Sequence, residues 1–282
     1  MKLIKSLFLF LLITAFFFQC DKSATGPKAG STYNMVLVPA GEFTMGTEDG
    51  SSDEQPEHTI YLDAFYIDLF EVTNFEYAEF LNAALKQGLI FADEYSASMS
   101  GFDLILLSEY DCRITFQGDR FVVESGQDDY PVVEVTWYGA NAYAQYYEKR
   151  LPTEAEWERA ARGADKRLYP WGNNTPTNYD CNFGQNLTGP TPVGYFSPNG
   201  ESPHGCTDMA GNVWEWCADW YDPAYYRNSP ASNPQGPAKG EYKVARGGSW
   251  FSNLLEIRTT SRSYGIYRAE NGNTGFRCAK NP

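Results

Sequence analysis

The chain is predicted to fold as an α+β domain with little regular secondary structure. Helix-start patterns alternate with short strand patterns, and a long stretch from Arg162 to Gly240 is rich in Gly, Pro, Asn and Trp. Such a stretch inside a compact domain needs something to hold it, such as metal ions, disulfides or buried aromatic side chains. Aromatic residues make up 16% of the chain, which suits a core of this irregular kind.

Residues 1–19 are predicted to be a signal peptide. Two lysines precede an apolar run from Ser6 to Phe18, which is too short for a comfortable membrane span. Cys20 follows directly, which favours lipidation of Cys20 and export as a membrane-anchored lipoprotein of the bacterial cell envelope. Gln19 is larger than the residue usual before such a cysteine, so ordinary secretion and an uncleaved anchor stay open as alternatives.

The polar stretch 20–33 is predicted to be a flexible tether, and the folded domain to span 34–282. Its first segment, Met35 to Gly46, predicts a strand, a turn at Pro39-Ala-Gly41 and a second short strand. The segment from Thr59 to Ile67 alternates well enough to predict one further strand.

Three helices are expected. Thr73-x-x-Glu76 is a capping box, which predicts a helix over 73–87. A second helix should begin near Thr136 and run through Tyr147, and a third should begin at the capping box that opens at Thr153. The apolar side of the first helix is formed by Phe75, Ala78, Leu81 and Leu85.

A variable segment, 88–130, separates the first two helices. Its second half, Arg113 to Glu124, predicts a hairpin that turns at Gly118-Asp119. We find no convincing internal repeat in the chain.

The charge balance is strongly acidic, with a formal net charge of −14. Such a surface repels phosphate backbones, so nucleic acid is not expected as a partner. Besides Cys20 the chain has five cysteines, an odd number, so at least one is free or pairs between chains. No two have Cys-x-x-Cys spacing, and the sequence leaves their connectivity open. They are Cys112, Cys181, Cys206, Cys217 and Cys278.

Five blocks of sequence, in order, resemble the formylglycine-generating enzymes, also called sulfatase-modifying factors. The resemblance covers nearly all of residues 34–280 and implies a C-type-lectin-like α+β fold with low regular secondary structure. The blocks are VPAGEFTMG at 38–46, PVVEVTW at 131–137 with RLPTEAEWE at 150–158, YPWG at 169–172, DMAGNVWEW at 208–216, and RGGSW at 246–250 with GFRC at 275–278.

The resemblance implies structural calcium. In the family, the positions that match Asp208, Gly211, Val213 and Glu215 bind a calcium ion, the middle two through their carbonyls. A hard cation prefers several oxygen ligands, which this segment can supply. The alternative is a buried turn whose acids cap backbone N–H groups. A second family calcium site implies Asn182, Phe183, Gln185 and Leu187, although the loop is shorter here.

The family's oxidase chemistry does not carry over in the same way. The family holds copper(I) between two cysteines five residues apart, and it oxidises a substrate cysteine with O₂. Ser252 and Ile257 occupy those two positions here, and copper(I) prefers thiolate ligands, so copper is not expected. Ser249 matches the family's active-site serine and Trp214 matches a groove tryptophan. Both also suit a purely structural role.

The sequence therefore predicts a lipid-anchored, non-catalytic binding or structural protein, whose cleft takes a peptide, protein or glycan ligand. The alternative is a formylglycine-generating-type oxidoreductase that acts on protein cysteine, or another oxidation on the same scaffold. Two isolated histidines, His58 and His204, exclude a three-histidine iron site within this chain. Motifs for phosphate or dinucleotide binding are absent from the sequence.

Overall fold

The computed structural model describes residues 34–266 and 271–282. Cys20, the predicted signal peptide and the predicted tether lie outside these residues. The helices of the described part are α1 (Asn74–Lys86), α2 (Trp137–Tyr146) and α3 (Glu154–Arg162), and a 3₁₀ turn spans Tyr225–Asn228. None of these helices is long and apolar enough to cross a membrane.

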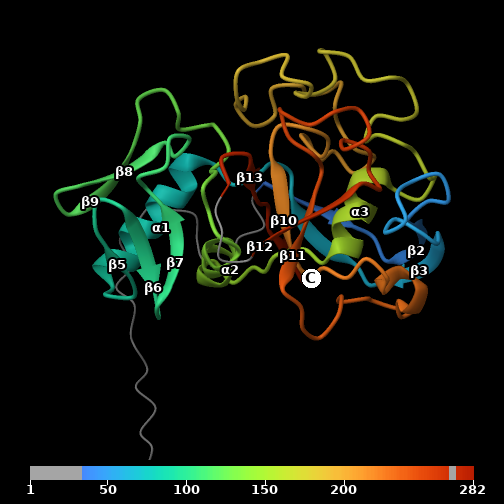
Figure 1. Ribbon diagram of the computed structural model, residues 1–282, viewed down its shortest axis with the longest axis horizontal. Coiled ribbons are helices and arrows are strands. Elements are labelled where there is room, and N and C mark those ends of the chain that lie inside the picture. Colours follow the sequence, from blue (N-terminus) through green and yellow to red (C-terminus); the bar gives the residue numbers. More distant parts are fainter. Residues whose placement is uncertain (1–33, 267–270) are drawn as a thin grey trace, which may run out of the picture.

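The strands of the described residues form five small sheets. The strands are β1 (Met35–Val38), β2 (Gly41–Met45), β3 (His58–Leu62), β4 (Phe65–Asp68), β5 (Phe91–Ala92), β6 (Ser96–Met99), β7 (Phe102–Leu106), β8 (Ile114–Gln117), β9 (Arg120–Val123), β10 (Trp214–Trp220), β11 (Tyr242–Arg246), β12 (Arg262–Ile266), β13 (Thr274–Gly275) and β14 (Ala279–Lys280). Strands β5 to β9 gather with α1 and α2 at one end, and β2, β3, β10 to β13 and α3 build the other (Figure 1). This mixture of short elements and long loops confirms the predicted α+β class.

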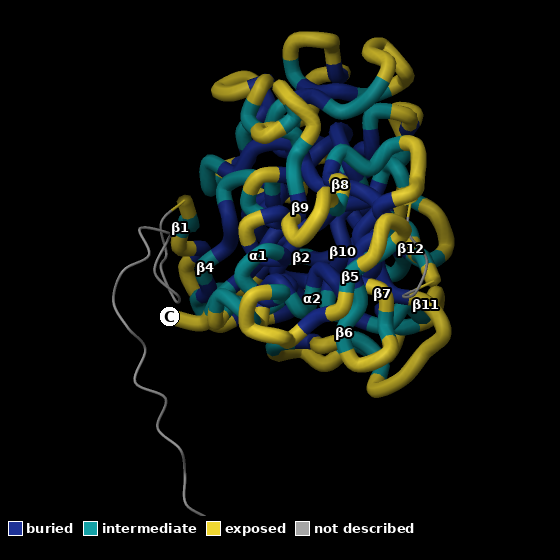
Figure 2. Tube along the Cα trace, turned by 90° about the vertical axis from the view of Figure 1, so that its left-hand side faces the viewer, coloured by how far each residue is buried: buried dark blue, intermediate teal, exposed yellow. Residues whose placement is uncertain are grey.

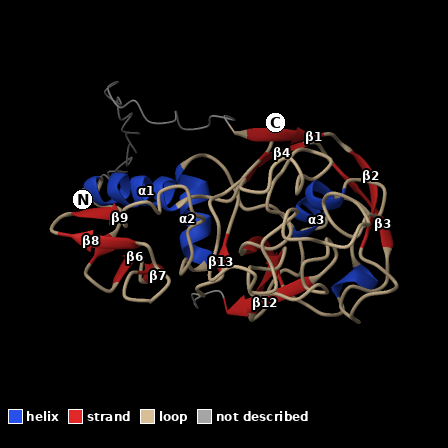
Figure 3. Ribbon diagram, turned by 90° about the horizontal axis from the view of Figure 1, so that it is seen from above, coloured by secondary structure: helices blue, strands red, loops and turns tan. Residues whose placement is uncertain are grey.

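The predicted single strand from Thr59 to Ile67 is wrong. The structure divides it at Asp63-Ala64 into β3 and β4, which belong to different sheets. β3 pairs with β2, whereas β4 lies between β1 and β14. The available signal was a change of phase, because the buried apolar positions are Ile60 and Leu62 in β3 but Phe65 and Ile67 in β4. The sheet β1-β4-β14 also brings the two ends of the described domain together (Figure 3).

The central sheet, in the order β12-β11-β10-β13, positions the residues of interest. β10 pairs antiparallel with β11 and parallel with β13. Glu215 on β10 lies opposite Arg246 on one side and Gly275 on the other. The two parts of the fifth matched block, at 246–250 and 275–278, therefore flank the fourth block in space.

Each predicted helix forms. The Thr73–Glu76 and Thr153–Glu156 capping boxes are both closed, and the Thr136 hydroxyl caps α2. Of the apolar set at helical spacing, Phe75 does not join the buried side of the helix, since it is 52% exposed. That side is formed instead by residues that include Tyr77, Phe80 and Leu81.

The segment 88–130 contains the predicted hairpin as β8 and β9, with Gln117 paired to Arg120. The structure adds a second hairpin, β6 and β7, that we had not predicted. Its turn residues, Ser100 and Gly101, both have positive φ. The Ser-Gly dipeptide between two short strands was the available signal.

The irregular stretch is not held by disulfides, because all five cysteines of the described residues are free thiols. Its segment 206–219 is almost entirely buried, whereas most of the rest is exposed or half-buried, and Figure 2 shows the buried tube around β10. Aromatic packing contributes, as in the stack of Tyr169 on Trp171 at 5.3 Å. Buried polar side chains contribute as well, since Asn212 accepts the backbone N–H of Thr191 at 2.8 Å.

Candidate functional site

The Gly-Gly-Ser turn follows directly on β11. Gly247 and Gly248 both have positive φ, which glycine tolerates without strain. A Cβ at Gly248 would lie 2.7 Å from the side chain of Ile257, so glycine also permits the turn to approach that residue. Ser252 closes the turn, because its hydroxyl accepts the backbone N–H of Ser249 at 3.1 Å.

The second family cysteine position is filled by an apolar side chain. Ile257 is fully buried, in a small cluster with Tyr169, Cys181 and Ala210. A buried hydroxyl and an aliphatic chain cannot replace two thiolates around copper(I). The residues present therefore do not fit the family's copper.

Cys181 is a neighbour that the sequence analysis did not anticipate. It is 76 positions from Ile257 in sequence and enters the same cluster through folding. Burial raises the pKa of the Cys181 thiol, so the group is protonated at neutral pH. A single buried thiol of this kind is structural rather than reactive.

The segment from Asp208 to Glu215 forms a tight loop that leads into β10. Asp208, Gly211 and Asn212 all have positive φ. A Cβ at Gly211 would stand 2.1 Å from the carbonyl oxygen of Asn182, so only glycine fits there. Val213 is fully buried. The loop thus packs its backbone directly against the segment that carries Asn182.

The two acids of this loop are already hydrogen-bonded. Asp208 accepts from the backbone N–H of Gly194 at 2.6 Å and from the Thr207 hydroxyl at 3.0 Å. Glu215 accepts from Arg277 at 2.7 and 2.8 Å and from the Trp157 indole at 2.8 Å. Burial raises the pKa of Asp208. Both acids therefore accept hydrogen bonds from buried donors, as the alternative reading expects. These bonds do not use every lone pair of the carboxylate oxygens.

A third acid, Glu71, faces the same loop and was missed from the sequence. It is 1% exposed, and its Oε1 accepts from the Asn212 side chain at 2.9 Å. Its Oε2 has no partner among the described residues. Burial, and next the charge of Asp208, hold the pKa of Glu71 well above its usual value.

These oxygens suit a hard cation such as calcium. Among the described residues, no three His, Cys, Asp or Glu side chains converge closely enough to hold a metal ion on their own. A calcium ion at this loop would need backbone carbonyls besides carboxylates, as the resemblance implies for Gly211 and Val213. Calcium here stays a prediction.

The second predicted calcium segment is spread over several environments. Asn182 is buried and donates to the Gly189 carbonyl at 3.0 Å, while its own Oδ1 is unpartnered among the described residues. Phe183 packs against the cluster of Ile257. Gln185 and Leu187 lie on the exposed surface. The structure brings Asn182 close to the first loop, and this second site also stays a prediction.

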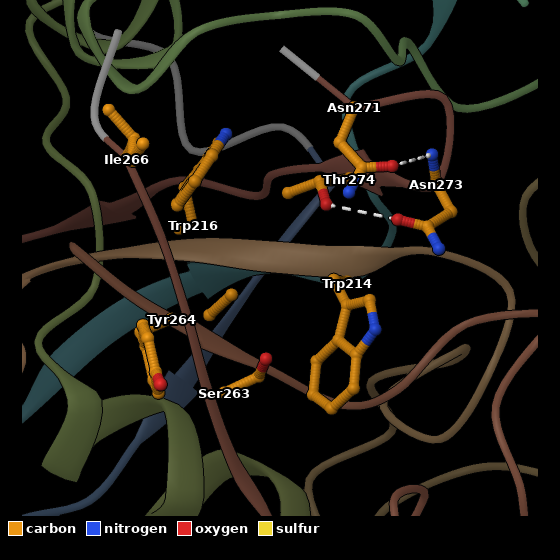
Figure 4. Close-up of a pocket in the computed structure, with 10 residues that line it drawn as sticks. Trp214, Trp216, Ser263, Tyr264, Ile266, Asn271, Asn273 and Thr274 are labelled. Atoms are coloured by element: carbon orange, nitrogen blue, oxygen red, sulfur yellow. Dashed lines mark hydrogen bonds between the residues drawn. The ribbon is translucent and has the colours of Figure 1, made fainter. Parts of the chain in front are cut away.

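A pocket of about 320 Å³ lies against the start of β10 (Figure 4). Three aromatic side chains line it, those of Trp214, Trp216 and Tyr264. A Cβ at Gly265 would stand 2.5 Å from the Trp216 ring, so this glycine lets the indole lie close under β12. The polar lining consists of Ser263, Asn271, Asn273 and Thr274.

No charged side chain lines this pocket within the described ranges. Of the four positions that match the family's active site, Trp214 lines the pocket. Ser249, Ser252 and Ile257 are buried and are not part of its lining. The described residues therefore combine an aromatic recess with a filled and inaccessible oxidase position.

Comparison with known families identifies the family to which this fold belongs. The model of the sulfatase-modifying factor enzyme 1-like domain matches residues 21–282. The chain belongs to this family. The sulfatase-modifying factor fold is also seen in the structure of PvdO from Pseudomonas aeruginosa, which has a TM-score of 0.66 and 26% identity and covers 88% of this chain and 94% of that one.

Curated relatives of this sulfatase-modifying factor-like protein have different names. A formylglycine-generating enzyme from Streptomyces coelicolor is 37% identical over 294 residues, with 90% of this chain and 92% of that protein covered. A protein from Bos taurus named inactive C-alpha-formylglycine-generating enzyme 2 is 33% identical, with 89% of each chain covered.

A third relative is longer. The serine/threonine-protein kinase pkn1 from Chlamydia pneumoniae is 41% identical over 266 residues, which make up 93% of this chain but 40% of that protein. The chain therefore spans about two fifths of the length of this relative.

Proposed function

We propose that this sulfatase-modifying factor-like protein is a non-catalytic binding protein of the cell envelope. Its ligand, a peptide, protein or glycan, would occupy the pocket beside Trp214, and calcium would serve as a structural ion at the Asp208–Glu215 loop. The lipid on Cys20 would hold the domain at the membrane.

The observation that carries the proposal is the filled oxidase position. The Ser252 hydroxyl accepts the backbone N–H of Ser249 and so closes the turn. Ile257 is fully buried in an apolar cluster. Neither side chain offers a soft ligand for copper(I). A fold can persist without its chemistry, because function depends on the site. The relative from Bos taurus whose name marks it as inactive supports the same view.

The pocket supports a binding role. Aromatic walls with a few hydroxyl and amide groups are typical of ligand sites, where rings supply contact area and polar groups set orientation. The similarity to the Streptomyces coelicolor enzyme along nearly its full length favours the alternative, a formylglycine-generating-type oxidoreductase. A binding protein and an oxidoreductase can be distinguished experimentally, because only the oxidoreductase would convert a peptide thiol.

The first test is turnover. The full chain is incubated with copper(I), O₂ and a peptide that contains Cys-x-Pro-x-Arg, and mass spectrometry follows the peptide thiol. We expect the thiol to remain, while the Streptomyces coelicolor enzyme, run in parallel, serves as the positive control. Conversion of the peptide would overturn the non-catalytic proposal and establish the alternative.

The binding role is tested on peptide and glycan arrays with fluorescently labelled protein. We expect bound spots to lose at least about tenfold in affinity in Trp214→Ala, because removal of a central aromatic contact commonly costs that much. Tyr179→Ala is the matched control, since Tyr179 is 78% exposed and does not line the pocket. An absence of binding on both arrays, or equal losses in both variants, would contradict a ligand in this pocket.

The anchor is tested separately through Cys20. In the native host, metabolic labelling with palmitate is expected to mark the wild-type chain and to be lost in Cys20→Ser, with the variant released from the membrane fraction. A single acyl chain binds membranes only marginally, whereas lipoprotein-type multiple acylation anchors firmly. Retention of the unlabelled variant in the membrane would favour the uncleaved anchor instead.

A further inference from the structure

The pocket beside Trp214 lies on the face of the central sheet. Trp216 is opposite Ala245, and Ala245 is opposite Ser263 on the next strand. Trp214 is opposite Thr274 on β13. Residues opposite each other in neighbouring strands share a face of the sheet, and all five of these residues line the pocket. The backbone N–H and C=O groups of a sheet lie in its plane and bond to neighbouring strands, so a ligand in this pocket contacts mainly side chains.

The aromatic part of the pocket is fixed before any ligand binds. The Trp216 indole donates to the Val135 carbonyl at 3.1 Å, and Gly265 leaves room for its ring, because a Cβ there would stand 2.5 Å away. Trp216 is only 3% exposed, whereas Trp214 is half-buried. Trp214 is therefore the indole that offers contact area to a ligand, and a preformed recess lowers the ordering cost of binding.

The polar part of the pocket contains a group of three linked residues, Asn271, Asn273 and Thr274 (Figure 4). The backbone N–H of Asn273 donates to Asn271 Oδ1 at 3.2 Å, and the Thr274 hydroxyl donates to Asn273 Oδ1 at 3.3 Å. These bonds orient both side-chain amides but do not use the N–H₂ group of either. The Ser263 hydroxyl also lines the pocket. The recess therefore presents amide and hydroxyl groups beside an aromatic ring.

A sugar ring matches this combination. A pyranose has C–H bonds on its faces, which can stack on an indole, and hydroxyl groups around its rim, which exchange hydrogen bonds with amides and hydroxyls. An extended peptide has backbone N–H and C=O groups that are commonly paired with the edge of a sheet, whereas this pocket lies on a face. Its volume of about 320 Å³ is at the lower end of the range for ligand pockets, about 300–1,000 Å³, which suits a short glycan segment.

We infer that the ligand of this pocket is a neutral glycan, one sugar ring of which stacks on Trp214 while its hydroxyl groups bond to the amides of Asn271 and Asn273. The inference rests on the proposed binding role and selects one ligand class among the peptide, protein and glycan ligands of that proposal. Stacking requires an aromatic ring at position 214, and an apolar side chain of another shape does not replace it.

The experiment screens the labelled full chain on an array of neutral and acidic glycans beside the peptide array. The free oligosaccharide of the brightest neutral spot is then titrated by isothermal titration calorimetry into the wild type and three variants. Trp214→Phe is expected to stay within about threefold of the wild-type affinity, because it keeps an aromatic face. Trp214→Leu is expected to lose about tenfold or more, and Asn273→Ala about 2–10-fold, the usual effect of one hydrogen bond.

Asn228→Ala is the matched control for Asn273→Ala, because Asn228 is exposed and does not line the pocket. It should bind as the wild type does, and melting curves establish that each variant is folded. Binding only to peptides or acidic glycans, lost in Trp214→Leu, would overturn the neutral glycan and leave the binding role standing. An absence of binding on both arrays would remove both. Equal affinities in Trp214→Phe and Trp214→Leu would overturn the stacked sugar ring.

Discussion

Replacement of Arg277 by methionine is expected to lower the free energy of unfolding by about 3–5 kcal/mol. Arg277 is fully buried, and its guanidinium forms a double hydrogen bond with Glu215. Methionine keeps an apolar stem of similar reach but leaves the Glu215 carboxylate with the Trp157 indole as its remaining donor. Loss of one partner of a buried ion pair is costly because the other charge stays buried and unpaired.

Urea denaturation of the full chain measures this loss, in calcium and in chelator. Lys166→Met is the control, since Lys166 and Glu57 form an exposed pair at 2.8 Å. An exposed pair contributes about 0–1 kcal/mol. The double variant Arg277→Met with Glu215→Gln should recover part of the loss, because it removes the unpaired charge. A loss in Arg277→Met no larger than in Lys166→Met would show that the buried pair adds no stability.

The double substitution Ser252→Cys with Ile257→Cys is expected to create copper(I) binding that the wild type lacks. The turn and its glycines are in place, so two thiols at these positions would restore the ligand spacing of the family. Two ligands on one rigid scaffold commonly bind about 10²–10⁴-fold more tightly than either alone. Competition with a chromogenic copper(I) chelator measures the affinity.

Cys181 must be controlled in this experiment, because it lies in the same cluster as Ile257. The double substitution is therefore compared in the wild-type and Cys181→Ala backgrounds, with each single cysteine variant beside it. Ile257→Cys shortens a fully buried side chain, with an expected cost of about 1–3 kcal/mol, so melting curves establish that each variant is folded. A folded double variant without copper(I) affinity would mean that the surrounding groove has diverged beyond these two residues.

Local signals in the sequence predicted the elements whose contacts are local. The capping boxes at Thr73 and Thr153 formed because each hydroxyl and its partner glutamate are three residues apart. The hairpin β8–β9 formed for the same reason. Pairing between distant strands was not predictable, and the segment around Asp63 was predicted as one strand although β3 and β4 join different sheets.

The residues of the candidate site also differ in whether a local sequence pattern could predict them. The loop from Asp208 to Glu215 could be located from its motif, since its members are close in sequence. Cys181 beside Ile257 and Glu71 beside Asn212 could not, because no short-range pattern encodes contacts across 76 and 141 positions.

The sequence by itself determined the family and the absence of a thiolate pair at positions 252 and 257, because side-chain identity decides which metals a position can bind. Only the tertiary structure decided that the five N–H groups of Arg277 donate to Glu215 and to three backbone carbonyls. Only the tertiary structure, likewise, left one oxygen of Glu71 unpartnered beside that pair. Hydrogen-bond capacity and charge balance in a buried region depend on which distant segments meet, and packing of the whole chain sets that arrangement.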